Sequence, residues 1–151
     1  MTWQAFESAS PDLAPLAFDC LDRKIAYLAT LKKDGSPRLH PVTPFIGDGM
    51  LFIFTEPSSP KIRDLRSDGR YVLHSSVGGG GPLVEVQVSG EAFVVRDPQL
   101  RARAERIAAS PVVIDSYVLF EFHVQRVLVV EYADGKPLVR RWRSPGSNGA
   151  I

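Results

Sequence analysis

The fold is decided by residues 25–77, which read IAYLATLKKDGSPRLHPVTPFIGDGMLFIFTEPSSPKIRDLRSDGRYVLHSSV. The stretch opens with an apolar run of strand length at 25–31, and the dipeptide Asp34-Gly35 follows it. Asp-Gly between two strand-like runs is a strong signal for a hairpin turn. The next run, 37–46, alternates in polarity but carries Pro41 and Pro44 in its interior. Because proline cannot donate a hydrogen bond to a neighbouring strand, we expect this run to lie at a sheet edge or to leave the sheet there.

The second half of the stretch continues the strand pattern and inserts one short helix. A glycine-bounded turn at 47–49 leads into MLFIFT, residues 50–55, whose continuous apolar character predicts a buried strand. A helix is expected over 60–66, because a proline starts it and Asp-Gly ends it. A fourth strand is expected over 70–77.

Beyond this stretch the C-terminal half adds more strands and a second helix. We predict a long strand over 83–95, with Gly90 as the site of a β-bulge. Asp97-Pro98 offers a cap and a first-turn proline for a helix that reaches about residue 109. Strands over 117–131 and 137–143 complete the body.

The N-terminal segment, 1–22, predicts two helices, the first capped by Thr2 and the second by Ser10 with Pro11 in its first turn. The tail, 144–151, is predicted to be loose. Six or seven strands joined mostly by hairpins predict a mainly β protein that forms a single domain over residues 1–151. A closed antiparallel barrel with peripheral helices and a β-sandwich both fit this pattern.

Composition excludes several classes of function. A formal net charge of +1 gives no reason to expect nucleic acid as a partner. No apolar run approaches the ~20 residues that span a membrane, and the N-terminus lacks the features of a signal peptide, so a cytoplasmic protein is expected. Cys20 is the single cysteine, so no disulfide or thiolate metal site can form within the chain. The three histidines show no ligand spacing, and no metal site is predicted: His40, His74 and His123.

One candidate site lies where a buried strand ends and a helix begins. Ser59 is expected at the N-cap of the helix, and Lys61 lies in its first turn. A cation there is unfavourable for the helix itself, but it would be explained by a bound phosphate. The alternative is a capped surface helix with a solvated lysine.

A second candidate site lies on the proline-containing run. In a strand, Arg38, His40 and Val42 share one face, while Pro41 and Thr43 share the other. Carbonyl groups next to proline lose their ladder partners, so a planar polar ligand could bind beside them. The alternative is an edge strand that proline and charge protect from pairing.

The series IAYLATLKKDGSPRLHPVTP, followed by MLFIFTEPSSPKIRDLRSDGRYVL, resembles the pyridoxamine-phosphate-oxidase-like family of FMN-binding split barrels. The resemblance covers residues 25–77 well and 84–90 loosely. It implies a Greek-key-like split β-barrel that works as a homodimer, with one flavin nucleotide at each interface and a small molecule as substrate.

The resemblance also assigns roles to residues by position. It implies that Arg38, Ser59 and Lys61 hold the flavin phosphate. It implies that Thr55 and the backbone of 40–43 line the ribityl chain and the ring, which adds these residues to the site: His40, Pro41, Val42 and Thr43.

The closing strand adds two candidates, because Trp142 and Arg143 resemble the aromatic and the arginine that reach a flavin across the dimer interface in this family. An exposed basic end strand is the alternative interpretation.

The chain departs from the true oxidase in two places. It lacks the late Arg-x-His motif for substrate, and Glu85 stands where the oxidase has a glutamine beside its flavin. We therefore expect an FMN-dependent oxidoreductase acting on another small, flat substrate. The alternatives are a reductase that uses a deazaflavin coenzyme and a non-catalytic protein that binds flavin or haem. No side chain is assigned as a catalytic acid, base or nucleophile.

Overall fold

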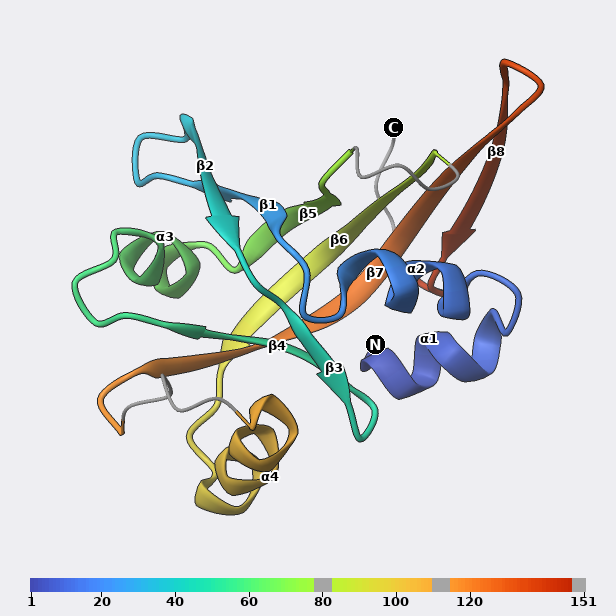
Figure 1. The fold of residues 1–151 in the computed structure, drawn as a ribbon. Coiled ribbons are helices and arrows are strands. Elements are labelled where there is room, and N and C mark those ends of the chain that lie inside the picture. Colours follow the sequence, from blue (N-terminus) through green and yellow to red (C-terminus); the bar gives the residue numbers. More distant parts are fainter. Residues whose placement is uncertain (78–82, 110–114, 148–151) are drawn as a thin grey trace.

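A computed structural model describes residues 1–77, 83–109 and 115–147 (Figure 1). These residues form four helices: α1 (Trp3–Ala9), α2 (Ala14–Leu21), α3 (Lys61–Ser67) and α4 (Pro98–Ala108). They also form eight strands: β1 (Ala26–Leu31), β2 (Pro37–Val42), β3 (Phe45–Gly47), β4 (Met50–Thr55), β5 (Arg70–Ser75), β6 (Val84–Val94), β7 (Val118–Ala133) and β8 (Lys136–Arg143). None of the helices in this part of the chain is long and apolar enough to cross a membrane.

All strand pairs are antiparallel, and the main path through the sheet runs β2-β1-β5-β6-β7-β4-β3, with β8 paired to β7. The two ends of the path, β2 and β3, are consecutive in the sequence and are joined only by Thr43-Pro44. The sheet therefore curls back on itself and is closed there by the chain rather than by ladder hydrogen bonds, as Figure 1 shows. This is a split β-barrel, the fold that the family resemblance implies, and the β-sandwich that the strand pattern also allowed is not formed by the described residues.

The central pair, β6 and β7, carries the predicted bulge. The register shifts between Ser89 and Gly90, because Gln125 of β7 is left without a partner opposite it. A Cβ atom built on Gly90 would lie 2.0 Å from the carbonyl oxygen of His123 and 3.1 Å from the backbone nitrogen of Gln125. Only a residue without a side chain fits at this crossing of the two strands.

The apolar residues form two clusters on opposite sides of the sheet. The larger one fills the barrel and is closed by α1 and α2; its largest fully buried members are Trp3, Phe6, Leu21, Leu28, Leu51, Ile53, Leu73, Phe120 and Phe122. The smaller one lies between the sheet and α4 and contains Met50, Phe52, Ala104, Ala108 and Leu119. The strand β4 is buried on both faces because it contributes to both clusters, which explains its continuous apolar sequence.

Local signals in the sequence predict most element boundaries. The side chain of Thr2 accepts a hydrogen bond from the backbone N–H of Ala5. The side chain of Asp97 accepts one from Gln99, at 2.8 Å. Both predicted caps are therefore confirmed, and the predicted strand at 50–55 has the bounds of β4.

Two predicted boundaries are wrong. The second helix begins at Ala14 rather than at Pro11, because the Ser10 hydroxyl donates to Asp12 and the residues between form a turn; Pro15 is the proline of the first turn. The run at 37–46 is two strands, β2 and β3, because the chain leaves the first sheet edge at Thr43-Pro44. The break adds an eighth strand to the six or seven expected.

The predicted loose tail is wrong at its start. Ser144 is buried, and its backbone nitrogen donates to the carbonyl oxygen of Gln125 at 2.8 Å. Residues 148–151 lie outside the described part of the chain.

Candidate functional site

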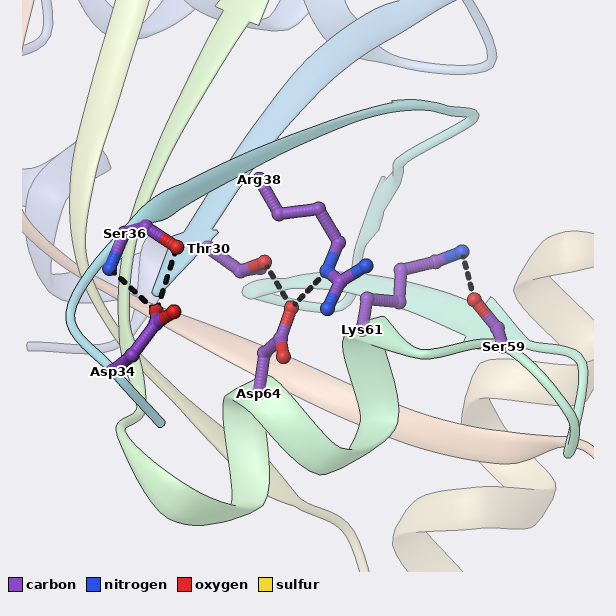
Figure 2. A network of polar contacts seen from close by, with 7 residues as sticks. All are labelled: Thr30, Asp34, Ser36, Arg38, Ser59, Lys61 and Asp64. Carbon is purple, nitrogen blue, oxygen red and sulfur yellow. Dashed lines mark hydrogen bonds and ion pairs between the residues drawn. The ribbon is translucent and has the colours of Figure 1, made fainter. Parts of the chain in front are cut away.

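A buried carboxylate ties α3 to the first hairpin. Asp64 is only 5% exposed, and its Oδ2 accepts hydrogen bonds from Thr30 Oγ1 of β1 and from Arg38 Nε of β2, both at 2.8 Å. Figure 2 shows the Arg38 side chain reaching from β2 over α3 to this carboxylate. The predicted face of β2 is confirmed, since Val42 is buried and Arg38 and His40 are half-buried on one side of the strand. Arg38 is thus engaged through Nε, which leaves its two Nη groups for another acceptor.

Lys61, the first residue of α3, turns away from this carboxylate. Its Nζ donates to the hydroxyl of Ser59 at 2.8 Å (Figure 2). Burial lowers the pKa of the Lys61 ammonium, and the carboxylate of Glu56 acts weakly against this effect. Among the described residues Lys61 forms no ion pair within 4 Å. It is a half-buried cation without an anionic partner, which is a costly arrangement unless a ligand completes it.

Ser59 is not the N-cap of α3, contrary to the prediction. Pro60 already has helical angles and occupies that position without a side-chain cap. The backbone N–H groups of Ile62 and Arg63 donate to the carbonyl oxygens of Ser59 and Pro60, both at 3.1 Å. These N–H groups are therefore not free for an anion, and the case for a phosphate depends on the Lys61 side chain instead.

A cavity of about 580 Å³ opens beside Lys61. We call it the main cavity; it is lined by Ile25, Pro41, Val42, Thr43, Phe45, Phe54, Thr55, Glu56, Lys61 and Tyr117. Its volume lies in the range of about 300–1,000 Å³ that is usual for sites of small molecules and cofactors. Five of the ten predicted site residues line it: Pro41, Val42, Thr43, Thr55 and Lys61.

Two buried polar atoms at this site have no partner among the residues that the structure describes. One is Oγ1 of Thr55, a residue that is 1% exposed and lines the main cavity. The other is Nε2 of His40, which lies on β2 next to the lining residue Pro41. Buried polar atoms are nearly always hydrogen-bonded, so both positions call for a ligand atom or a water.

A second, basic hollow of about 460 Å³ has Arg38 in its lining. We call it the basic hollow; it is lined by Lys32, Lys33, Asp34, Arg38, Arg63, Asp64 and Ser67. Four cations and two carboxylates give it a net positive charge, and one of the carboxylates, Asp64, is already paired.

Trp142 and Arg143 are not brought to the main cavity within one chain. The ring of Trp142 packs edge-on against Phe6 at a centroid distance of 5.0 Å, and the residue pairs with Val127 of β7. The cavity residue Thr55 pairs with Val118 of the same strand, and nine residues of strand span about 30 Å. The structure therefore assigns Trp142 a packing role over α1 in its own chain.

Comparison with known proteins adds the family. The sequence model described as pyridoxamine 5′-phosphate oxidase matches residues 17–131. The chain belongs to this family. The match includes every residue that lines the main cavity and the basic hollow, and it ends before Trp142. No curated protein sequence matches the chain significantly.

Solved structures show that the family's fold is shared with proteins of several kinds. A haem-binding protein from Mycobacterium smegmatis superposes with a TM-score of 0.65 at 20% identity, over 81% of this chain and 53% of that one. This chain thus spans about half the length of the mycobacterial protein. PhzG from Burkholderia lata, solved with tetrahydrophenazine-1-carboxylic acid, gives 0.66 at 15% identity, over 97% and 89%. A NimC/NimA family protein from Clostridium acetobutylicum gives 0.63 at 16% identity, over 85% and 92%.

Sequence reasoning missed half of the cavity lining. The missed residues are Ile25, Phe45, Phe54, Glu56 and Tyr117. Tyr117 reaches the cavity because β4 pairs with β7, and that pairing has no local signal. The only signal in the sequence for this missed lining was the presence of aromatic residues on the two strands that flank the turn at 47–49.

Titratable groups that could hold a metal do not gather at this site. The described residues contain no group of three or more histidine, cysteine, aspartate or glutamate side chains in reach of one ion. Glu56 does line the main cavity, but hydrogen bonds from the Ser58 hydroxyl and backbone N–H lower the pKa of its carboxyl. Glu56 is therefore a carboxylate near neutral pH and cannot donate a proton to a substrate.

Proposed function

We propose that this chain binds FMN in the main cavity and acts as a flavin-dependent oxidoreductase on a small, flat substrate. The observation that carries the proposal is the buried Thr55 hydroxyl, which has no hydrogen-bond partner among the described residues. It lies in a cavity that also holds the half-buried ammonium of Lys61, which has no ion-pair partner within 4 Å among those residues. Family membership makes a flavin the first group to test against these residues.

The residues present fit FMN at both ends of the molecule. Lys61, with the Nη groups of Arg38 nearby on β2, supplies the positive charge that a phosphate requires. The Thr55 hydroxyl can hydrogen-bond the ribityl chain or the ring edge. Phe45, Phe54 and Tyr117 supply apolar walls for a flat ring system.

A bound flavin would supply the hydride-transfer chemistry itself, and the protein's part is to bind, orient and shield it. The apolar wall of the main cavity favours a planar substrate. The structural neighbour PhzG was solved in complex with tetrahydrophenazine-1-carboxylic acid, a fused-ring compound, which supports a ring-containing substrate.

Titration of the purified protein with FMN and with riboflavin tests the proposal. Replacing Lys61 with alanine is expected to weaken FMN binding by about 10- to 100-fold, because the phosphate loses its hydrogen bond to a positively charged ammonium group. Riboflavin has no phosphate, so its affinity is expected to change little. Lys136→Ala, at the exposed start of β8, is the matched control and should bind FMN as the wild type does.

Three results would count against the proposal. Lys61→Ala could weaken the binding of FMN and of riboflavin equally, which would show that Lys61 does not contact the phosphate. FMN could fail to bind the wild-type protein. FMN could bind but resist reduction by nicotinamide and other donors in the presence of flat acceptors, which would make the chain a flavin-binding protein without turnover.

A deazaflavin coenzyme is a second candidate, and the basic hollow is the observation that favours it. The anionic tail of such a coenzyme could pass Arg38 and reach Lys33 and Arg63. The double change Lys33→Ala with Arg63→Ala should then weaken binding of the deazaflavin coenzyme and leave FMN binding unaffected.

Haem is less well supported, because none of the residues found to line the main cavity is a histidine, cysteine or methionine.

We also propose that two copies of the chain pair through the outer face of β1 and β2. Tyr27, Leu39 and Pro41 are exposed on this face, and no helix of the described chain covers it. Ile25 and Pro41 line the main cavity and are themselves exposed, so a second copy placed here would close the cavity. Trp142 or Arg143 of that copy would then be able to approach the flavin.

Sedimentation velocity tests the pairing. The wild-type protein is expected to sediment as a dimer, and Leu39→Glu, which puts a charge at a position that is 66% exposed, is expected to sediment as a folded monomer. Phe18→Glu on α2, another exposed apolar residue, is the control that should remain dimeric. A monomeric wild-type protein, or a dimeric Leu39→Glu variant, would contradict this interface.

A further inference from the structure

The imidazole of His40 has a buried nitrogen with nothing to bond. Its Nε2 has no hydrogen-bond partner in the described part of the chain, although the atom is shielded from solvent. The residue lies on the same face of β2 as Arg38, and its partner across the ladder is Leu28 of β1, which offers no polar group. None of the described residues satisfies this nitrogen, which is therefore open to a ligand atom or a water.

The charges around His40 are mostly positive. Burial lowers the pKa of His40, and Lys61 of α3 and Arg38 of β2 lower it further, while Asp64 of α3 raises it. The Asp64 carboxylate already accepts hydrogen bonds from Arg38 and Thr30, so its negative charge is largely compensated. The free protein thus keeps His40 neutral near pH 7, because the imidazolium would be a third cation beside two others.

An anion at this position would reverse that balance. A phosphate bound by Lys61 would place negative charge next to His40, where two cations dominate in the free protein. The phosphate oxygens are acceptors only, so Nε2 can bond them as a donor. The imidazolium form would then be favoured instead of disfavoured.

We propose that His40 is a binding residue that takes up a proton from solvent when the phosphate group of the nucleotide docks beside Lys61. This inference rests on the proposed function, and it adds a residue whose side chain neither the cavity lining nor the family resemblance assigns to the phosphate.

The direction of the pH dependence follows from the two states. The pKa of His40 is below its ordinary value in the free protein, and the phosphate raises it in the complex. Between these two values binding consumes one proton, so FMN affinity rises as the pH falls through the window. The affinity gain is about tenfold for each unit by which the pKa rises.

The phosphate of FMN also titrates near pH 6, so the comparison must remove its contribution. His40→Gln keeps a polar side chain that cannot titrate, and the phosphate is common to both proteins. The ratio of wild-type to His40→Gln affinity is expected to increase by about tenfold from about pH 8 to about pH 5.5. His123→Gln, on β7, is the matched control and should keep the wild-type dependence.

Nuclear magnetic resonance titration of the histidine ring protons provides a direct readout that needs no stable His40 variant. The His40 signal can be assigned by elimination with His74→Gln and His123→Gln. We expect its midpoint to lie below 6.5 in the free protein and to move up when FMN is added. Riboflavin, which has no phosphate, should not change the titration midpoint of His40.

The outcomes separate this inference from the proposed function. FMN binding that depends on Lys61, together with a His40 midpoint that FMN does not move, would overturn the role of His40 alone. An affinity ratio that stays constant with pH would do the same. If FMN does not bind the wild-type protein, both the proposed function and this inference are overturned.

Discussion

Replacing Gly90 with alanine is expected to lower the free energy of unfolding by about 3 kcal/mol, at the upper end of what overpacking usually costs. The added methyl carbon would lie 2.0 Å from the carbonyl oxygen of His123, which is backbone of the central strand β7. Gly90 does not have a positive φ, so the cost comes from the clash and not from backbone strain. Urea unfolding followed by circular dichroism measures the loss.

Gly47→Ala is the matched control for this prediction. A Cβ atom there would also be too close to a neighbour, but the neighbour is Cγ2 of the Ile107 side chain, at 2.7 Å. A side chain can rotate away where a backbone carbonyl cannot, so the cost should be about 1 kcal/mol. If Gly90→Ala is no less stable than Gly47→Ala, the bulge does not require glycine.

The second large effect is expected from Asp64→Asn, which should cost about 2 kcal/mol of unfolding free energy. The change removes the charge that holds the Arg38 guanidinium, while an amide oxygen can still accept from Thr30. Breaking a fully buried pair costs about 3–5 kcal/mol, and the figure is reduced here because the Arg38 side chain is 32% exposed. FMN affinity should hold or rise, because a negative charge leaves the vicinity of the phosphate.

Asp48→Asn provides the comparison for an exposed ion pair. Asp48 Oδ2 lies 3.6 Å from Nε of Arg103, and both side chains are largely exposed. Such pairs contribute little, so the change in unfolding free energy should stay within about 0.5 kcal/mol. Equal losses in the two variants would show that the buried carboxylate does not anchor α3 to the hairpin.

The features predicted correctly from the sequence are those with local causes. Thr2 and Asp97 cap helices through their own side chains, and Asp34-Gly35 turns a hairpin whose partners are adjacent in the chain. The bulge at Gly90 was predicted because a glycine interrupts an otherwise regular apolar alternation. Each of these features depends on a few neighbouring residues, which is the range over which sequence patterns are informative.

The wrong and missing predictions concern side chains that are used by another partner, and contacts between segments that lie far apart in the sequence. Ser59 has the residue type of a cap, but its hydroxyl is taken by Lys61 and the cap position passes to Pro60. Tyr117 enters the cavity only because β7 pairs with β4, two strands that lie far apart in the sequence. The packing of Trp142 on Phe6 in its own chain was also not predicted, while its expected approach to a flavin across a dimer interface stays a prediction. Such contacts become visible only when the topology is known.

The strand order has a consequence for how the protein is made. The hairpin β3–β4 is complete when Thr55 has been synthesised, but its other neighbour begins with Val118. At roughly 5–20 residues per second, the ribosome needs roughly 3–13 s to supply that strand. During this time an apolar strand that is buried on both faces in the native barrel has an unpaired edge. Slower growth at low temperature or added holdase chaperones should therefore raise the yield of soluble protein more than changes in the C-terminal hairpin, whose two strands emerge together.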